Sequence, residues 1–226
     1  MTTQELSPTA RTTPTRGRNR QVDDRQRLMA LLSDALVAHL GVVAGAHPAV
    51  LPTAFGVDES GPDDGGTLYL HGSVAAGWLG PALEQDVCVT VTELDGLVLA
   101  RTGFHHSMNY RSAVVIGRPR LVTDAEERRR ALDLVVDHML PGRSATLRPA
   151  TRKELAATVV IALPLAEASM KQREGGATLE PGDLELTGWA GQVPVRRVAS
   201  APVTEDYVSE PVPEIVLRRA AELGQG

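Results

Sequence analysis

The densest run of polar side chains away from the two ends of the chain is Phe104-His105-His106-Ser107-Met108-Asn109-Tyr110-Arg111-Ser112. On an extended chain alternate residues share a face, so Asn109 lies with Arg111. Tyr110 and Ser112 share the other face. A guanidinium near hydroxyl groups suits a phosphate, because it forms paired, charge-assisted hydrogen bonds. A salt bridge on an edge strand would use the same arginine, and the sequence leaves both interpretations open.

Two other segments carry groups that suit an anion. His71-Gly72-Ser73 stands where an apolar run enters a turn, and a hydroxyl with turn N–H groups can hold a phosphate. Lys171 and Arg173 lie in a segment that ends in two glycines, where a solvated loop is the equal alternative. Trp189 has Gly188 before it and Gly191 soon after it, which would let its ring lie flat against a ligand or a neighbouring subunit.

The sequence argues against a metal centre and against hydrolytic chemistry. His105 and His106 are adjacent, so an extended chain points them to opposite faces, and no third ligand follows at a suitable spacing. The single cysteine, Cys88, excludes an internal disulfide and a cysteine-built zinc site, and its alternating surroundings indicate packing. The nucleophile-elbow, zinc-protease, P-loop and dinucleotide-binding motifs are missing from the sequence.

Short strands are expected to position these groups. In residues 87–93 three valines alternate with Cys88, Thr90 and Thr92, which predicts a sheet with one apolar face. Asp95-Gly96 follows and predicts a hairpin turn, because glycine adopts positive φ at little cost. A long β-branched run at 158–165 predicts a central strand. The other expected strands are residues 40–44, 49–57 (broken by Pro52), 67–71, 97–101 and 109–122.

Helices are expected at four places. Apolar side chains at helical spacing follow Asp24, and Asp124 with Glu127 makes an acidic capping box before a second helix that Pro141-Gly142 ends. Thr151 with Glu154 marks a short third helix, and residues 214–223 could form a terminal one. Many short strands, few helices and no βαβ alternation predict a mostly antiparallel barrel with peripheral helices, an α+β architecture.

Composition narrows the class of protein. A net charge of −5 gives the chain no overall footprint for nucleic acid. Its apolar runs fall short of the ~18 residues that indicate a membrane span, and no signal-peptide core follows the start. With the lone cysteine, these features predict a cytoplasmic protein, and the richness in Ala, Arg, Gly, Val and Asp is typical of a high-GC bacterium.

Four segments, in this order, resemble the flavin-nucleotide-binding branch of the pyridoxamine-phosphate-oxidase-like superfamily, which includes nitroimidazole-reductase-like proteins. They read LYLHGS, VCVTVTELDGLVLARTGFHHSMNYRSAVVIGRPRLV, EERRRALDLVVDHMLPGR and SMKQREG with WAGQVPV. The likeness runs from about Arg18 to Val195. It implies an FMN-binding split β-barrel and a homodimer whose two flavin sites draw residues from both chains.

The resemblance also implies site residues. The turn at His71 and Ser73 would lie near the flavin phosphate, and Asn109, Tyr110, Arg111 and Ser112 would line the cofactor, with Lys171, Arg173 and Trp189 closing the pocket. The chain departs from its relatives at one point, because Ala76-Gly77 stands where they carry a Ser-Arg pair or a similar basic pair. A missing arginine removes a charge-assisted bond, on the order of 1.5–3 kcal/mol, so FMN binding is expected to be weakened.

The first hypothesis is therefore an FMN-dependent oxidoreductase that reduces a small organic substrate with electrons from NAD(P)H. The second keeps the fold without the flavin, as a repurposed enzyme or a binding protein for another flat ligand such as haem or a deazaflavin. A third is a flavin-storage or regulatory protein. Residues 1–20, with four arginines, are expected to be a disordered tail or an arm over a partner. Residues 21–200 would form the barrel and 201–226 a C-terminal extension.

Overall fold

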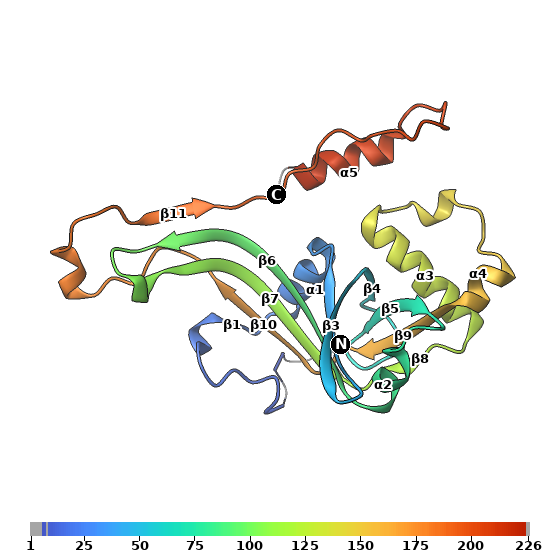
Figure 1. The fold of residues 1–226 in the computed structure, drawn as a ribbon, viewed down its shortest axis with the longest axis horizontal. Helices are drawn as coiled ribbons and strands as arrows, with labels where there is room; N and C mark the ends of the chain where they lie inside the picture. Colours follow the sequence, from blue (N-terminus) through green and yellow to red (C-terminus); the bar gives the residue numbers. More distant parts are fainter. Residues whose placement is uncertain (1–5, 8, 225–226) are drawn as a thin grey trace.

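The computed structural model describes residues 6, 7 and 9–224. Within them the chain forms two antiparallel sheets (Figure 1). The larger runs β1-β10-β7-β6-β2-β3, with β11 also on β6, and the smaller runs β4-β5-β9-β8. The strands are β1 (Gln21–Val22), β2 (Ala38–Ala44), β3 (His47–Thr53), β4 (Phe55–Asp58), β5 (Thr67–Ser73), β6 (Val87–Leu99), β7 (Ser107–Gly117), β8 (Arg120–Leu121), β9 (Thr158–Pro164), β10 (Ala168–Arg173) and β11 (Gly191–Pro194).

Five α-helices and four 3-10 turns accompany these strands within the described residues, and together they confirm the expected α+β architecture. The helices are α1 (Arg25–Asp34), α2 (Leu79–Glu84), α3 (Ala125–Met139), α4 (Arg152–Ala157) and α5 (Glu214–Gly224). The turns are η1 (Arg18–Arg20), η2 (Gly103–His105), η3 (Ser144–Thr146) and η4 (Pro181–Leu184). None of the described helices is long and apolar enough to cross a membrane.

The core lies between the two sheets and is closed by α1. Val87, Val89 and Val91 are buried, as their alternation predicts, and Leu28, Leu31 and Leu32 of α1 pack into the same cluster. Leu40, Phe55, Leu70, Leu163 and Met170 add side chains from other strands of both sheets. Burying each of these large side chains contributes about 1.5–3 kcal/mol, so this cluster dominates the stability of the barrel.

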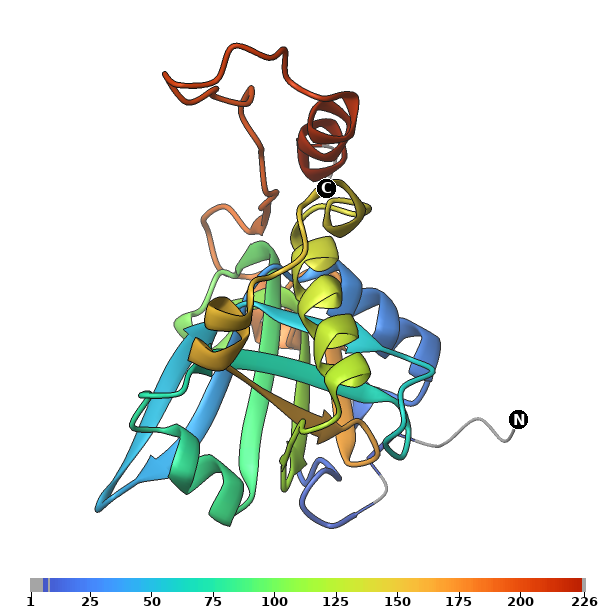
Figure 2. The ribbon, with the colours of Figure 1, turned by 90° about the vertical axis from the view of Figure 1, so that its right-hand side faces the viewer.

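The predicted helix starts are confirmed. Asp24 caps α1 by accepting a hydrogen bond from the backbone N–H of Gln26, and Asp124 caps α3 in the same way. Thr151 and Glu154 form a reciprocal capping box at α4. Beside the barrel, α3 packs closely against β4 (Figure 2). Gly56 permits this approach, because a side chain there would come within 3.1 Å of the α3 backbone.

The hairpin predicted at Asp95-Gly96 is wrong. Residues 87–99 form one long strand, β6, which pairs with β7 across a β-bulge between Leu94 and Gly96. Gly96 is needed there because a Cβ would lie 3.1 Å from the carbonyl oxygen of Val193 on β11. Pairing on both sides therefore outweighs the local turn preference, and the chain reverses at residues 100–106 instead.

Three other segments differ from the expected structure. The run 49–57 breaks after Thr53 rather than at Pro52, which sits in the edge strand β3 where its missing N–H is tolerated. The run 109–122 becomes β7 and β8. The segment around Lys171 is the strand β10 rather than a loop, and the run 158–165 is β9, an inner strand of its sheet, as expected.

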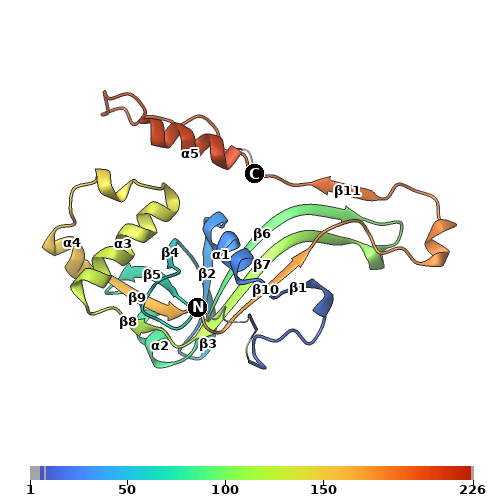
Figure 3. The same ribbon diagram turned by 180° about the vertical axis from the view of Figure 1, so that it is seen from behind.

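The two ends of the chain lie differently. Near the start, Leu6 is buried and Arg11 pairs with Asp86 and Glu167, so the described part of the predicted tail lies on its own barrel. Near the end, β11 pairs with β6 on the long β6–β7 ribbon, and α5 lies outside the barrel near the C-terminal end of α3, as Figures 1 and 3 show.

Candidate cofactor site

The turn that follows β5 is small and open. Ser73 is exposed and its Oγ accepts a hydrogen bond from the backbone N–H of Ala75 at 3.2 Å. The backbone N–H of Ala76 bonds the Ser73 carbonyl oxygen at 3.0 Å, which closes the turn. A side chain at Gly77 would meet open space, so nothing in the described chain blocks a larger residue at this position.

His71 precedes this turn and is half-buried. Its Nδ1 is buried and has no hydrogen-bond partner among the described residues. Burial lowers the pKa of the imidazole, so the ring is uncharged near neutral pH. An uncharged imidazole with a free nitrogen can accept a hydrogen bond or bind a metal ion.

Trp78 forms one side of the same turn. Its ring covers Gly72, because a Cβ on Gly72 would lie 2.7 Å from Cζ2 of the indole. Trp78 also packs on the main core cluster. Any side chain larger than hydrogen at position 72 would therefore displace the ring, which explains the glycine between His71 and Ser73.

A second group of polar side chains lines the outer face of the larger sheet. Tyr110 lies opposite Arg173, and Ser112 lies opposite Lys171, so these four side chains share one face. All four are half-buried. Lys171 donates a hydrogen bond to the carbonyl oxygen of Arg16 at 3.4 Å. Two cations and two hydroxyl groups on one face suit an anionic ligand such as a flavin phosphate.

Asn109 and Trp189 lie at the far end of the β6–β7 ribbon. Asn109 is buried, donates from Nδ2 to Oε1 of Gln192 at 2.8 Å and accepts a hydrogen bond from Arg173. Trp189 is 67% exposed, and its ring covers Gly191, where a Cβ would lie 2.6 Å away. The structure therefore joins Asn109 to Arg173 and Gln192 and leaves Trp189 free on the surface.

Arg111 lies on the opposite, inner face of β7 and is engaged in ion pairs. Its guanidinium contacts Asp34 at 2.9 Å and Asp95 at 3.0 Å. Those hydrogen bonds, that with Asp95 foremost, raise the pKa of Arg111. The salt bridge left open by the sequence is thus what the structure shows, although on an inner strand. A phosphate role for Arg111 stays a prediction that would require these pairs to open.

The same inner face continues into the C-terminal region. Arg197 contacts Asp34 at 3.1 Å and Glu93 at 3.4 Å. Burial raises the pKa of Glu93, partly offset by Arg197. Three carboxylates and two guanidinium groups, gathered from residues far apart in the sequence, therefore form one network.

The predicted site residues fall into two groups on different sheets. His71 and Ser73 belong to β5 in the smaller sheet, whereas residues 109–112 and 171–173 belong to β7 and β10 in the larger one. Sequence reasoning missed Trp78, Gln192 and Arg197. Only the tryptophan left a signal, because an aromatic residue shortly after a polar turn can cover a glycine in it.

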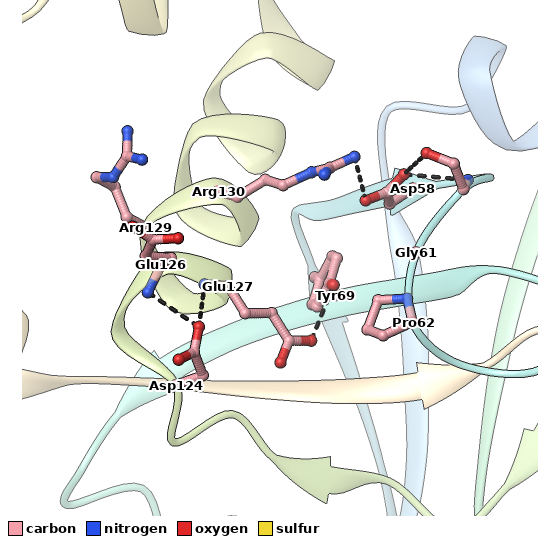
Figure 4. Close-up of a pocket in the computed structure, with 10 residues that line it drawn as sticks. Asp58, Gly61, Pro62, Tyr69, Asp124, Glu126, Glu127, Arg129 and Arg130 are labelled. Carbon is pink, nitrogen blue, oxygen red and sulfur yellow. Dashed lines mark hydrogen bonds and ion pairs between the residues drawn. The ribbon is translucent and has the colours of Figure 1, made fainter.

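A hollow of about 640 Å³ beside α3 holds another polar cluster (Figure 4). The hydroxyl of Tyr69 donates to Glu127 at 3.0 Å, and burial, followed by this bond, raises the pKa of Tyr69 to about 12. Glu127 also pairs with Arg120, and the buried Asp58 pairs with Arg130 at 2.6 Å. These groups satisfy one another, so the cluster fastens α3 to the smaller sheet.

Solved structures resemble the chain over nearly its whole length. The flavocytochrome Anf3 from Azotobacter vinelandii has 33% identity and a TM-score of 0.86, covering 94% of this chain and 98% of its own. The FAD and haem binding protein from Mycobacterium smegmatis has 37% identity and a TM-score of 0.80, covering 88% and 97%. No match was found among curated proteins.

A third solved structure supports the fold alone. It is a protein from Bacteroides thetaiotaomicron assigned to 5-nitroimidazole antibiotic resistance, with 24% identity and a TM-score of 0.55, covering 67% of this chain and 85% of its own. The family model described as pyridoxamine 5'-phosphate oxidase matches residues 24–172, from the cap of α1 to β10. The flavin-binding split barrel expected from the sequence is thereby confirmed, and the chain belongs to the pyridoxamine 5'-phosphate oxidase family.

Proposed function

We propose that this protein is a redox protein that holds a flavin and a haem in one split-barrel homodimer. The observation that carries the proposal is His71, an uncharged, half-buried imidazole with a buried ring nitrogen that has no hydrogen-bond partner among the described residues. Two relatives of at least 33% identity are named for flavin with cytochrome and for FAD with haem. A histidine nitrogen is the usual protein ligand of haem iron.

The half-buried His138 and His105 and the exposed His106 have contacts that make them weaker candidates. His138 shares its Nε2 with the carbonyl oxygen of Ala35 at 2.7 Å, and the Phe55 ring lies beside it. His106 shares its Nδ1 with the carbonyl oxygen of Thr102 at 2.9 Å. His105 lies beside carboxylates of η4. A haem ligand needs a free lone pair, which His71 offers without breaking a hydrogen bond, although the atoms that bury its Nδ1 would have to move.

The flavin would lie against the outer face of β7 and β10. Lys171 and Arg173 supply positive charge for its phosphate groups, and the hydroxyls of Tyr110 and Ser112 supply hydrogen bonds. We propose FAD rather than FMN, because one relative is named for FAD and because Ala76-Gly77 removes the phosphate anchor expected for FMN. The bound flavin and haem would supply the redox chemistry, while these side chains bind and orient them.

The division of the candidate site between two sheets supports our proposal of a homodimer. The β5 turn and the β7–β10 face belong to different sheets of one chain, and a second copy would bring the turn of one subunit to the face of the other. An FMN-dependent oxidoreductase that passes electrons from NAD(P)H to a small organic substrate is the second candidate. The Lys171–Arg173 face favours it, since that face suits either flavin.

The test is reconstitution of the purified protein with each cofactor, separately and together, followed by visible absorption. Wild-type protein should give a haem spectrum, and His71→Ala should lose it while FAD binding changes by less than about threefold. His106→Ala, a change of the same kind on a histidine with a backbone partner, should keep both. Loss of flavin binding with an intact haem spectrum in His71→Ala would instead place His71 at the flavin and overturn the haem proposal.

A further inference from the structure

The residues that follow β11 have an unusual surface. We call residues 195–224 the strap; they end in α5. From residue 171 to residue 224 the described chain contains no buried side chain. Within the strap Val203 is 94% exposed and Tyr207 is 85% exposed, and Val198, Val208 and Leu217 are also exposed. A segment with no fully buried side chain gains little apolar burial to offset the entropy lost on ordering it.

The surface of the whole chain is too large for a compact monomer. A folded monomer of this mass, 24.1 kDa, exposes about 10,000 Å², whereas this chain exposes 13745 Å². Two chains together carry an excess of roughly 7,400 Å², more than the roughly 2,000–5,000 Å² that an obligate dimer interface typically buries in total, so a dimer contact could cover a large part of it. The strap and the long ribbon, which both project from the barrel in Figures 1 and 3, account for the elongated shape.

Polar contacts fix the course of the strap. The backbone N–H of Val195 bonds the carbonyl oxygen of Asp95 at 3.1 Å, and Arg197 joins the network at Asp34 and Glu93. At the other end Arg219 donates to the carbonyl oxygen of Met139 at the end of α3, at 3.0 Å. Because the anchors lie near its two ends, residues 198–213 loop away from the barrel (Figure 2), and Val198, Val203 and Val208 within them are exposed.

The chain itself offers a matching set of uncovered apolar side chains. On the β6–β7 ribbon Phe104 is 90% exposed and Met108 is 51% exposed, and Leu94 and Leu97 are also exposed. A two-fold pair of identical chains would cover both sets in both subunits with one kind of contact. The area to be covered, the mirrored apolar sets and the fixed course of the strap all favour a second copy over an unrelated partner.

We propose that the strap lies on the barrel or ribbon of a second copy of this chain, so that each subunit clasps the other. This inference rests on the homodimer of the proposed function and adds the segment that holds it together. β11, at the base of the strap, carries Gln192, which bonds Asn109, and Asn109 in turn accepts a hydrogen bond from Arg173 of the proposed flavin site. The strap lies outside residues 24–172, the part that matches the family model.

A photo-crosslink tests the contact directly. A photo-reactive phenylalanine analogue replaces Tyr207 in the full-length protein, without added flavin or haem, and a second full-length chain carries an epitope tag. Irradiation of the mixed proteins should join labelled to tagged chains in a product of twice the chain mass. Crosslinks only within one chain, or none, would overturn the proposal. Tyr207→Phe, which has a similar ring without the photo-reactive group, is the control.

A substitution tests the energy of the contact. The double change Val203→Asp and Tyr207→Asp should raise the dimer dissociation constant by at least about tenfold, because it places two charges in a desolvated contact. Val50→Asp on the edge strand β3, where Val50 is 66% exposed, measures the effect of added charge alone. An unchanged dissociation constant in the double variant, measured by sedimentation, would overturn the strap. Cofactor binding enters neither experiment, so the strap can fail while the flavin and haem sites stand, and those sites can fail while the strap stands.

Discussion

The barrel and the C-terminal part of this chain, residues 171–224, are held together by different means. In the barrel, side chains such as Leu28, Phe55 and Leu163 are at most 1% exposed and pack into one cluster. The C-terminal part has no buried side chain among its described residues, and backbone pairing and arginine contacts fix its position. Polar contacts can therefore fix the position of a segment while its apolar side chains stay exposed to solvent.

The two faces of β7 also differ in whether their polar side chains are paired. The inner face carries Arg111 in a network of carboxylates that contributes to folding. The outer face carries Tyr110 and Ser112, whose side-chain hydroxyl groups have no hydrogen-bond partner within the described chain. Paired charges stabilise structure, whereas unpaired polar groups on a half-buried face are available to a ligand. The candidate site is therefore expected on the outer face.

The largest expected effect comes from the core. Leu40→Ala should lower the free energy of unfolding by about 2–5 kcal/mol, because it leaves a cavity among fully buried side chains. The matched change Leu184→Ala, at a position 65% exposed in η4, should change it by less than about 0.5 kcal/mol. Urea unfolding at one protein concentration compares the two. Equal losses would mean that the C-terminal part belongs to the same packed core.

An intermediate effect is expected where the two regions meet. Arg111→Ala should cost about 1–2 kcal/mol in the cofactor-free protein, because it leaves Asp34 and Asp95 unpaired at a partly exposed site. Arg197→Ala should cost about 1 kcal/mol or less and should speed proteolysis within residues 198–213. Thermal unfolding and limited proteolysis measure these effects. Protease resistance in Arg197→Ala would show that the strap is held independently of the network.

The smallest effect concerns pH. Burial lowers the pKa of both His71 and His138, so the folded protein resists protonation that the unfolded chain accepts below its ordinary value of about 6.5. The contribution of these two uncharged histidines to stability is therefore fully present above pH 6.5 and is lost as the pH drops below that value. The thermal midpoint should be lower at pH 5.5 than at pH 7.5, and less so in His138→Phe. If His138→Phe shows the same pH dependence as the wild type, His138 does not contribute to the pH dependence of stability.

The sequence by itself determined the local elements. Alternating valines in β6, the caps at Asp24 and Asp124, and the capping box at Thr151 were readable because each depends on residues a few positions apart. The family resemblance rested on motifs of the same kind. It correctly predicted the split barrel and its family, while the flavin roles of the polar residues of β7 and of the turn after β5 stay predictions.

Only the tertiary structure decided which of those residues are free. Arg111 pairs with Asp34 across 77 positions, and Arg197 pairs with the same residue across 163 positions. No local pattern could therefore reveal that Arg111 is already paired or that Arg197 anchors the strap. The same holds for the bulge at Gly96, where the approach of β11 converts an apparent hairpin turn into continuous strand. Local preferences are worth about 1 kcal/mol, and two ladders of backbone hydrogen bonds across one strand exceed them.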